Sequence, residues 1–290
     1  MDSVQWDHRP SGLRAPAMVC AFDGWNDAGD SASLAVNSMV DSFGGNEFAR
    51  IEMEPFLDLR ETRPTIRLVD GEVRELVWPA TTLSEVFAPR APRDLIVVSG
   101  PEPALSWRRY CDTLLELAET LGCSMVVTLG AFLADVPHTH PVPIAGSASD
   151  PALSERLGLV PSNYEGPAGI TSALHYSCSR AGIPSVSLWA AVPHYIAAMP
   201  NPKAALALVR RMESLTGVIV DAEALESDAV EQERQVEQAV QHDSDLRGFV
   251  EQLEEAAAEE NDEEEEIPSG DSIERDVQRF LRQRDAGDEA

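Results

Sequence analysis

The segment AMVCAFDGWNDAGDSAS (residues 17–33) starts as a short apolar run, turns at a glycine and continues as a helical pattern. A strand, a glycine turn and a helix form the repeating unit of α/β folds with parallel sheets. The apolar run is too short for an independent helix and does not alternate, which is typical of a strand covered on both faces. This segment therefore predicts an α/β domain.

Three further apolar runs have the same character: DLIVVSG (94–100), SMVVTLG (124–130) and SVSLWAAV (185–192). Helical patterns lie between and after the runs, over residues 29–43, 104–121, 168–181 and 202–216. Residues 46–54 and 66–78 differ from these runs, and Asp70-Gly71 inside RLVDGEVRELVW (67–78) predicts a β-hairpin. We therefore expect antiparallel strands as well. The predicted fold is an open, mixed and mainly parallel sheet with helices on both faces.

Near residue 219 the composition changes, because proline and glycine become rare and acidic residues accumulate. Residues 221–290 hold 25 Asp and Glu against 6 Arg, a net charge of −19, whereas residues 1–220 hold 25 against 16, a net charge of −9. Two apolar stripes predict amphipathic helices that are separated near HDSD (242–245). The stripes comprise Leu225, Ala229, Val236 and Val240, and then Leu246, Phe249, Val250, Leu253 and Ala257.

These patterns divide the chain into three parts. We expect an α/β domain over 1–218, an amphipathic helical extension over 219–258, and an acidic linker with a short terminal helix over 259–290. Within the last part, residues 260–271 predict a solvated, disordered linker and residues 272–284 a helix.

The net charge of −28 argues against nucleic-acid binding and against docking on anionic lipid, both of which rely on Lys and Arg. Four cysteines without a C-x-x-C pair indicate buried, reduced thiols. The first residues lack the apolar segment of a secretion signal, and no apolar run approaches the ~20 residues that span a bilayer. We therefore expect a cytoplasmic protein with no membrane association.

Ligands of open α/β sheets bind outside the carboxyl ends of the strands. Four loops are predicted at these ends, and they hold the unusual residues of the sequence. They are DGWNDAG (23–29), SGPEPALSW (99–107), GAFLADVPHTHP (130–141) and AVPHYIAAMPNP (191–202). Their convergence predicts a site at this edge.

The first of these loops is not a phosphate site, since no Lys-Ser/Thr follows its glycines and its three aspartates would repel an anion. We favour a structural role in which Asp27 or Asp30 caps the following helix and Trp25 packs over it. The alternative is a turn that recognises a cation, an amine or hydroxyl groups.

Each other polar candidate has two interpretations. His138 and His140 form an H-x-H pair, but flanking prolines favour a hydrogen-bonded loop over a metal site. Glu165 fits a turn or cap, with a general base as the alternative. For His194 we favour a packed loop residue over a base. We assign no catalytic residue, cofactor or metal. The candidate pocket or interface residues are Asp23, Gly24, Trp25, Asn26, Asp27, Asp30, His138, Asn163, Tyr164, Glu165, Gly166 and His194.

Several stretches together resemble the bacterial, especially actinobacterial, type-2 branch of the proteasome assembly chaperone superfamily. They are GWNDAGDSAS (24–33), GAFLADVPHTHP (130–141), NYEGPAGI (163–170), and SLWAAVPHYI (187–196) followed by NPKA (201–204). The resemblance covers about residues 15–215. It implies a fold similar to nucleoside phosphorylases and peptidyl hydrolases, self-association, and a non-catalytic role in assembly with proteasome subunits as partners. It supplies no established catalytic residues.

These observations lead to two hypotheses about the function. We favour a homo-oligomeric scaffold or assembly chaperone, expected to be a trimer by analogy with trimeric phosphorylase-like folds. Its helical extension is expected to pack on its own domain or protomer, with a partner helix as the alternative, and its acidic charge favours basic partners. The second hypothesis is a phosphorylase/hydrolase-like enzyme with a small-molecule pocket at the strand ends. Hydrolysis would then be favoured over phosphorolysis, because the loops lack cations.

Overall fold

The computed structural model describes residues 3–69, 73–159 and 165–265. Its contacts divide the chain into two compact units, residues 1–239 and 240–290. The first unit contains the sheet and most of helix α6 (Glu223–His242). The second contains the end of α6 and helix α7 (Ser244–Glu265). No helix among the described residues is long and apolar enough to cross a membrane.

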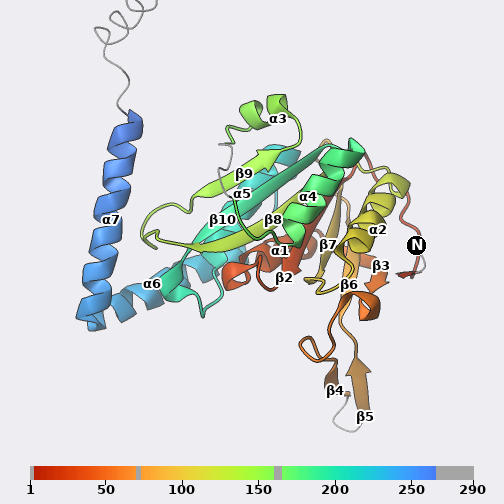
Figure 1. The fold of residues 1–290 in the computed structure, drawn as a ribbon, viewed down its shortest axis with the longest axis horizontal. Helices are drawn as coiled ribbons and strands as arrows, with labels where there is room; N and C mark the ends of the chain where they lie inside the picture. The colour runs from red at the N-terminus through yellow and green to blue at the C-terminus, as the bar shows by residue number, and fades with distance from the viewer. Residues whose placement is uncertain (1–2, 70–72, 160–164, 266–290) are drawn as a thin grey trace, which may run out of the picture. The chain divides into compact units, whose positions relative to one another are not determined.

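The first unit is built on an eight-stranded mixed sheet in the order β1-β3-β6-β7-β2-β8-β10-β9 (Figure 1). Four parallel strands form its centre: β7 (Leu95–Pro101), β2 (Ala17–Asp23), β8 (Met125–Ala134) and β10 (Ser185–Pro193). Antiparallel strands flank them: β1 (Val4–Trp6), β3 (Asn46–Glu52) and β6 (Ala80–Val86) on one side, and β9 (Ile144–Ala148) on the other. All four predicted apolar runs are therefore central parallel strands, and the α/β class with a mixed sheet is confirmed.

Helices cover both faces of this sheet, as predicted. Alternate residues of β2 belong to two different apolar clusters. One cluster includes α1 (Ser31–Phe43) and α5 (Pro202–Thr216), and the other includes α2 (Trp107–Thr120) and α4 (Ile170–Ala181). Because both faces of β2 are buried, its sequence is a continuous apolar run and does not alternate.

The predicted hairpin is confirmed, but it lies apart from the main sheet. Strands β4 (Thr65–Val69) and β5 (Val73–Val77) pair only with each other, and they project from the body of the domain (Figure 1). The Asp70-Gly71 turn lies outside the described residues. The antiparallel strands of the main sheet instead come from β1, β3, β6 and β9. Of these, β1, β6 and β9 were not predicted, because they are short or alternate between apolar and polar residues.

Helix α6 packs on its own domain, as we favoured. Leu225, Ala229 and Val236 are buried, and Leu225 belongs to the cluster that contains α1 and α5. The Gln232 amide donates to the carbonyl of Pro200 at 2.5 Å. The apolar stripe of this helix is therefore used within the fold.

The predicted break between the two C-terminal helices is at Asp243, whose side chain accepts hydrogen bonds from the first amides of α7, Asp245 N (3.0 Å) and Leu246 N (3.1 Å). Helix α7 continues to Glu265, beyond the predicted start of the acidic linker, because glutamate is a good helix former. The rest of that linker and the helix predicted over 272–284 lie outside the described residues.

The entry into β2 is fixed by the buried carboxylate of Asp94. It accepts hydrogen bonds from Arg14 N and Arg14 Nη2, both at 2.7 Å, and from Ala88 N at 2.9 Å. Burial raises the pKa of Asp94, but the hydrogen bonds from Arg14 and from the Ala88 amide outweigh it, so the net pKa lies below its ordinary value. Since the folded pKa is lowered, the carboxylate stabilises the fold above the unfolded pKa of about 3.9 and loses this effect as the pH falls.

We predict that Asp94→Asn lowers the urea midpoint of unfolding at pH 7, because the amide cannot accept the same charge-assisted bonds. The difference from the unsubstituted protein should shrink as the pH is lowered from 7 towards 3. Urea titrations at several pH values measure it, with the exposed Asp41→Asn as the matched control. A difference of equal size at every pH would contradict this account.

Candidate functional site

The loops predicted to converge do lie at one edge of the sheet, because β2, β7, β8 and β10 are parallel and end there together. Backbone hydrogen bonds join the first turn to its neighbours. Ala131 N donates to Asn26 O at 2.8 Å, and Glu102 N donates to Asp23 O at 3.0 Å. The turn at 23–30 is therefore held by the loops on both sides of it.

The centre of this edge is the side chain of Asn26, which is fully buried. Its amide nitrogen donates to Glu102 Oε1 at 2.6 Å, and its oxygen accepts from the Thr171 hydroxyl at 3.1 Å. Glu102 Oε1 also accepts from Ile170 N, the first amide of α4, at 2.9 Å. The helix N-terminus stabilises the negative charge of the Glu102 carboxylate. These hydrogen bonds together join the turn after β2, the end of β7 and the start of α4.

Gly169 leaves room for this network. A Cβ atom at residue 169 would lie 1.7 Å from Asn26 Oδ1. The backbone at Gly169 has a φ of −91°, which any residue can adopt, so close approach alone requires the glycine. The presence of Gly169, the second glycine of the NYEGPAGI stretch (163–170), is thus explained by its contact with the Asn26 side chain, 143 positions earlier in the chain.

Asp27 caps α1, which confirms the structural interpretation of this turn. Its carboxylate accepts from Ala32 N at 2.6 Å and from Ser33 N at 3.2 Å. The Ser33 hydroxyl contacts both Asp27 (2.5 Å) and Asp23 (2.9 Å). Burial raises the pKa of Asp27, and the bonds from Ser33 and from the Ala32 amide partly oppose the rise.

Of the two predicted capping residues, the structure selects Asp27, and the predicted packing of Trp25 is wrong. Asp30 makes no capping bond with its side chain, because Gly29 and Asp30 adopt positive φ angles of 60° and 51° and helix α1 begins only at Ser31. Trp25 does not pack over the helix, since 64% of its surface is exposed.

An open hollow lies beside this turn, with a volume of about 560 Å³. Trp189 on its wall is fixed: its N–H donates to Ser187 Oγ at 3.0 Å, and a Cβ at Gly130 would lie 2.7 Å from its ring. The Phe132 ring lies 6.5 Å from the Trp189 ring. We call this cavity the strand-end hollow, and its lining residues are Gly24, Trp25, Asp27, Ala28, Gly29, Asp30, Phe132, Leu133, Trp189, Ala197, Ala198, Met199 and Pro200.

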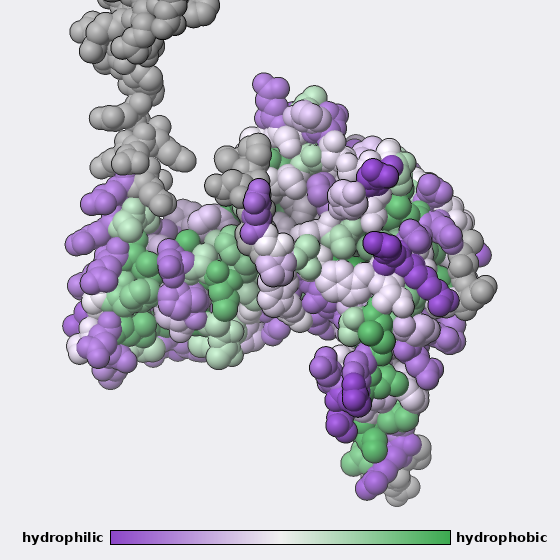
Figure 2. Space-filling view, viewed as in Figure 1, coloured by the Kyte–Doolittle hydropathy of each residue, from purple (hydrophilic) through white to green (hydrophobic). Residues whose placement is uncertain are grey.

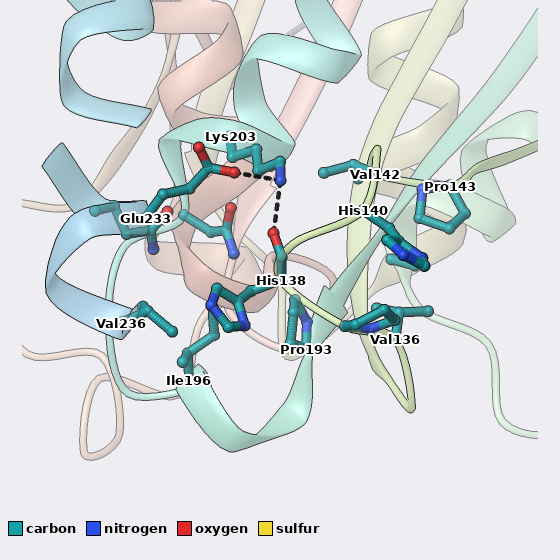
Figure 3. A pocket seen from close by; sticks show the side chains of 14 residues that line it. Val136, His138, His140, Val142, Pro143, Pro193, Ile196, Lys203, Glu233 and Val236 are labelled. Atoms are coloured by element: carbon teal, nitrogen blue, oxygen red, sulfur yellow. Dashed lines mark hydrogen bonds and ion pairs between the residues drawn. The ribbon is translucent and has the colours of Figure 1, made fainter. Parts of the chain in front are cut away.

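A second, small cavity of about 20 Å³ is shown in Figure 3. The buried His138 contacts the Tyr195 hydroxyl through its Nδ1 at 2.8 Å and through its backbone amide at 2.7 Å. Lys203 Nζ donates to the carbonyl of His138 at 2.6 Å and also to Glu233 of α6. The prediction of a hydrogen-bonded loop is confirmed for His138. No group of three or more potential metal ligands is found among the described residues.

The remaining candidates do not line the strand-end hollow. The side chain of His194 is 44% exposed, and its Nδ1 lies 2.9 Å from Asp135 Oδ1. Its ring lies 6.0 Å from the Tyr195 ring, so His194 is a loop residue that is only partly packed. Glu165 and Gly166 are exposed in an irregular segment. Asn163 and Tyr164 lie outside the described residues.

Sequence reasoning missed Glu102, Thr171 and Trp189 as parts of this edge. Glu102 is the only acidic residue of the loop SGPEPALSW, which was an available signal. The chain's single lysine, Lys203, was not predicted as a site residue. Its contacts show that it joins the loop of His138 to α6.

Comparison with known proteins gives consistent matches. The profile of the PAC2 family matches residues 21–240. A PAC2 family protein from Streptomyces avermitilis is 46% identical, with a TM-score of 0.76, and the alignment covers 81% of this chain and 99% of that one. A proteasome-assembly chaperone homologue from Mycobacterium tuberculosis is 43% identical, with a TM-score of 0.75 and the same coverage.

An archaeal proteasome activator from Pyrococcus furiosus shares the fold at 18% identity, with a TM-score of 0.67 and coverage of 81% and 97%. Among curated proteins, none matches this chain.

We predict that Gly169→Ala destabilises the fold by about 2–4 kcal/mol, because the new methyl group displaces the buried Asn26 amide from its partners. Urea unfolding measures the loss. Gly248→Ala is the matched control: nothing lies within 4 Å of its Cβ position in α7, so it should be neutral or stabilising by up to about 1 kcal/mol. In an Asn26→Ala background, Gly169→Ala should lower the free energy of unfolding by less than it does in the unsubstituted protein. An equal loss in both backgrounds would show that the contact with Asn26 is not the cause of the destabilisation.

Proposed function

The chain belongs to the PAC2 family, and on that premise we propose that it is a homo-oligomeric assembly chaperone or scaffold that acts without catalysis and has proteasome subunits as partners. The family match spans residues 21–240, which is most of the chain. The Mycobacterium tuberculosis protein that is 43% identical is named a proteasome-assembly chaperone homologue. These two similarities support the class of function and the kind of partner.

The observation that carries an interaction role is the projecting β4–β5 hairpin. Ile66 and Leu76 pair across it, and the alternation of strands places Leu68 and Trp78 on the same face. These four side chains are 48–63% exposed, and Figure 2 shows apolar surface along this arm. An isolated two-stranded hairpin is marginally stable in water, so this face favours contact with another protein. We propose that a second copy of the chain covers it.

The polar groups at the strand ends support a non-catalytic role. Asn26 and Glu102 are used to fix α4, and Asp27 is used to cap α1. Each group thus has a structural partner within the fold. No specific observation favours the phosphorylase/hydrolase-like alternative.

We propose a trimer, by analogy with trimeric phosphorylase-like folds, and a location in the cytoplasm. The four cysteines are thiols, and burial raises the pKa of Cys111 to about 11 and those of Cys123 and Cys178 to about 12. Unreactive thiols are typical of a reducing compartment, which supports this location.

We predict that Leu68→Ser together with Trp78→Ser reduces the oligomer to smaller species. Each lost apolar contact should weaken association by about tenfold or more. Multi-angle light scattering measures the mass, which for a trimer is three times the 31.5 kDa of the chain. Tyr176→Ser is the control, since Tyr176 on α4 is 64% exposed, comparable with Leu68 at 60% and Trp78 at 52%. An unchanged mass in the double variant would exclude the hairpin as the contact.

We predict that the full chain binds purified proteasome α subunits in preference to β subunits, and that removal of residues 243–290 weakens this binding. That segment holds 18 Asp and Glu against 5 Arg, so the difference should be large at low salt and small at high salt. The truncation keeps α6, which packs on the domain. Surface plasmon resonance measures both forms. If the full chain binds neither kind of subunit, the proteasome is not its partner.

A further inference from the structure

The strand-end hollow has aromatic rings on its walls. Trp25 and Phe132 are exposed, and Trp189 is half-buried behind them. Exposed aromatic groups gathered around one cavity are typical of binding surfaces. Their ring faces carry partial negative charge and attract organic cations.

The charges around the hollow have one sign. Asp27 and the exposed Asp30 belong to its lining, and Asp23 contacts the same Ser33 hydroxyl as Asp27. None of the lining residues that the structure describes is Lys, Arg or His. The carboxylate of Asp27 is buried and already bonds the start of α1, so Asp30 is the exposed carboxylate of the lining. A positive group in the hollow would therefore meet carboxylates and ring faces without a competing cation.

Parts of the lining of the hollow are held by contacts within the fold. Trp189 is held by Ser187 and lies against Gly130. At Gly29, another lining residue, the carbonyl accepts from Asn201 N at 2.6 Å, and a Cβ would lie 2.9 Å from the Asn201 Cβ. A preformed cavity binds without the entropic cost of ordering its walls.

We propose that the strand-end hollow binds an arginine or lysine side chain presented by a peptide segment of a partner protein. The cation lies against Asp30 and the aromatic rings, and the aliphatic part of the side chain lies against Leu133 and Met199. The hollow is open, with Trp25 and Leu133 exposed at its edge, whereas a free small molecule is normally enclosed over most of its surface. A side chain that reaches in from a docked backbone fits such an open cavity. This inference rests on the proposed function, since it names the chemistry of a partner contact.

The test uses the full chain and two synthetic tripeptides, acetyl-Ala-Arg-Leu-amide and the same peptide with citrulline in place of arginine. Citrulline keeps the shape and removes the charge. Isothermal titration calorimetry at low salt should show binding of the arginine peptide at least about tenfold tighter than that of the citrulline peptide. The affinity for the arginine peptide should fall as salt is added. Equal affinities, or no binding of either peptide, would overturn the proposal.

Two substitutions test whether the arginine peptide binds in the strand-end hollow. Trp25→Ala and Asp30→Asn should each weaken binding of the arginine peptide by about fivefold to tenfold. Their controls are Tyr176→Ala, whose side chain is equally exposed at 64%, and Asp41→Asn, which makes the same charge change at an exposed position of α1. Variants and controls that bind alike would show that the peptide does not occupy the hollow. Binding of agmatine without binding of the peptide would assign the hollow to free amines and would also overturn the proposal.

The peptide-binding test and the test for binding of proteasome subunits can fail independently of each other. Proteasome α subunits that bind the full chain while the arginine peptide does not would overturn the inference alone. Peptide binding with the expected effects of Trp25→Ala and Asp30→Asn, in a chain that binds no proteasome subunit, would overturn the proposed partner and leave the inference supported.

Discussion

The buried amide of Asn26 determines how the carboxyl edge of the sheet is built. It lies in the turn that follows β2, donates to a carboxylate that follows β7, and accepts from the first turn of α4. In a medium of low dielectric constant, an amide without partners would be strongly destabilising, so both partners must be in place. The same carboxylate receives the first amide of α4, and the close approach excludes any side chain at Gly169. The positions of three elements and one glycine therefore follow from a single side chain.

The central sheet could be predicted from the sequence because burial on both faces leaves a local signature. Each of the four central strands is a continuous apolar run, and the helix predicted over 202–216 coincides with α5. Strands β1, β6 and β9 leave weaker signatures, since they are short or covered on one side only. The hairpin was visible through its turn sequence, but no local pattern indicates that it stands apart from the sheet.

The candidate site was predictable in position and not in detail. Parallel strands end at one edge, so the convergence of the four loops follows from the strand pattern. The partners of Asn26 lie 76 and 145 positions away, and no spacing rule connects residues at such distances. Asp27 was recognisable as a cap because capping is local, whereas the exposure of Trp25 and His194 depends on how loops pack in three dimensions. The family match ends at residue 240 and the first compact unit at residue 239, so nearly all of α6 belongs with the sheet.

Lys203 limits how the protein reacts with amine-directed reagents. It is the only side-chain primary amine in the chain, and 23% of its side chain is accessible while it bonds Glu233 of α6. Amine-directed cross-linkers therefore react with one side chain only. Cross-linking that measures distances between pairs of lysines within a chain cannot be applied to this protein. Conversely, acylation of that single amine requires it to leave both Glu233 and the carbonyl of His138. The rate of its modification is thus a built-in report on how often Lys203, at the start of α5, loses these contacts, without any introduced label.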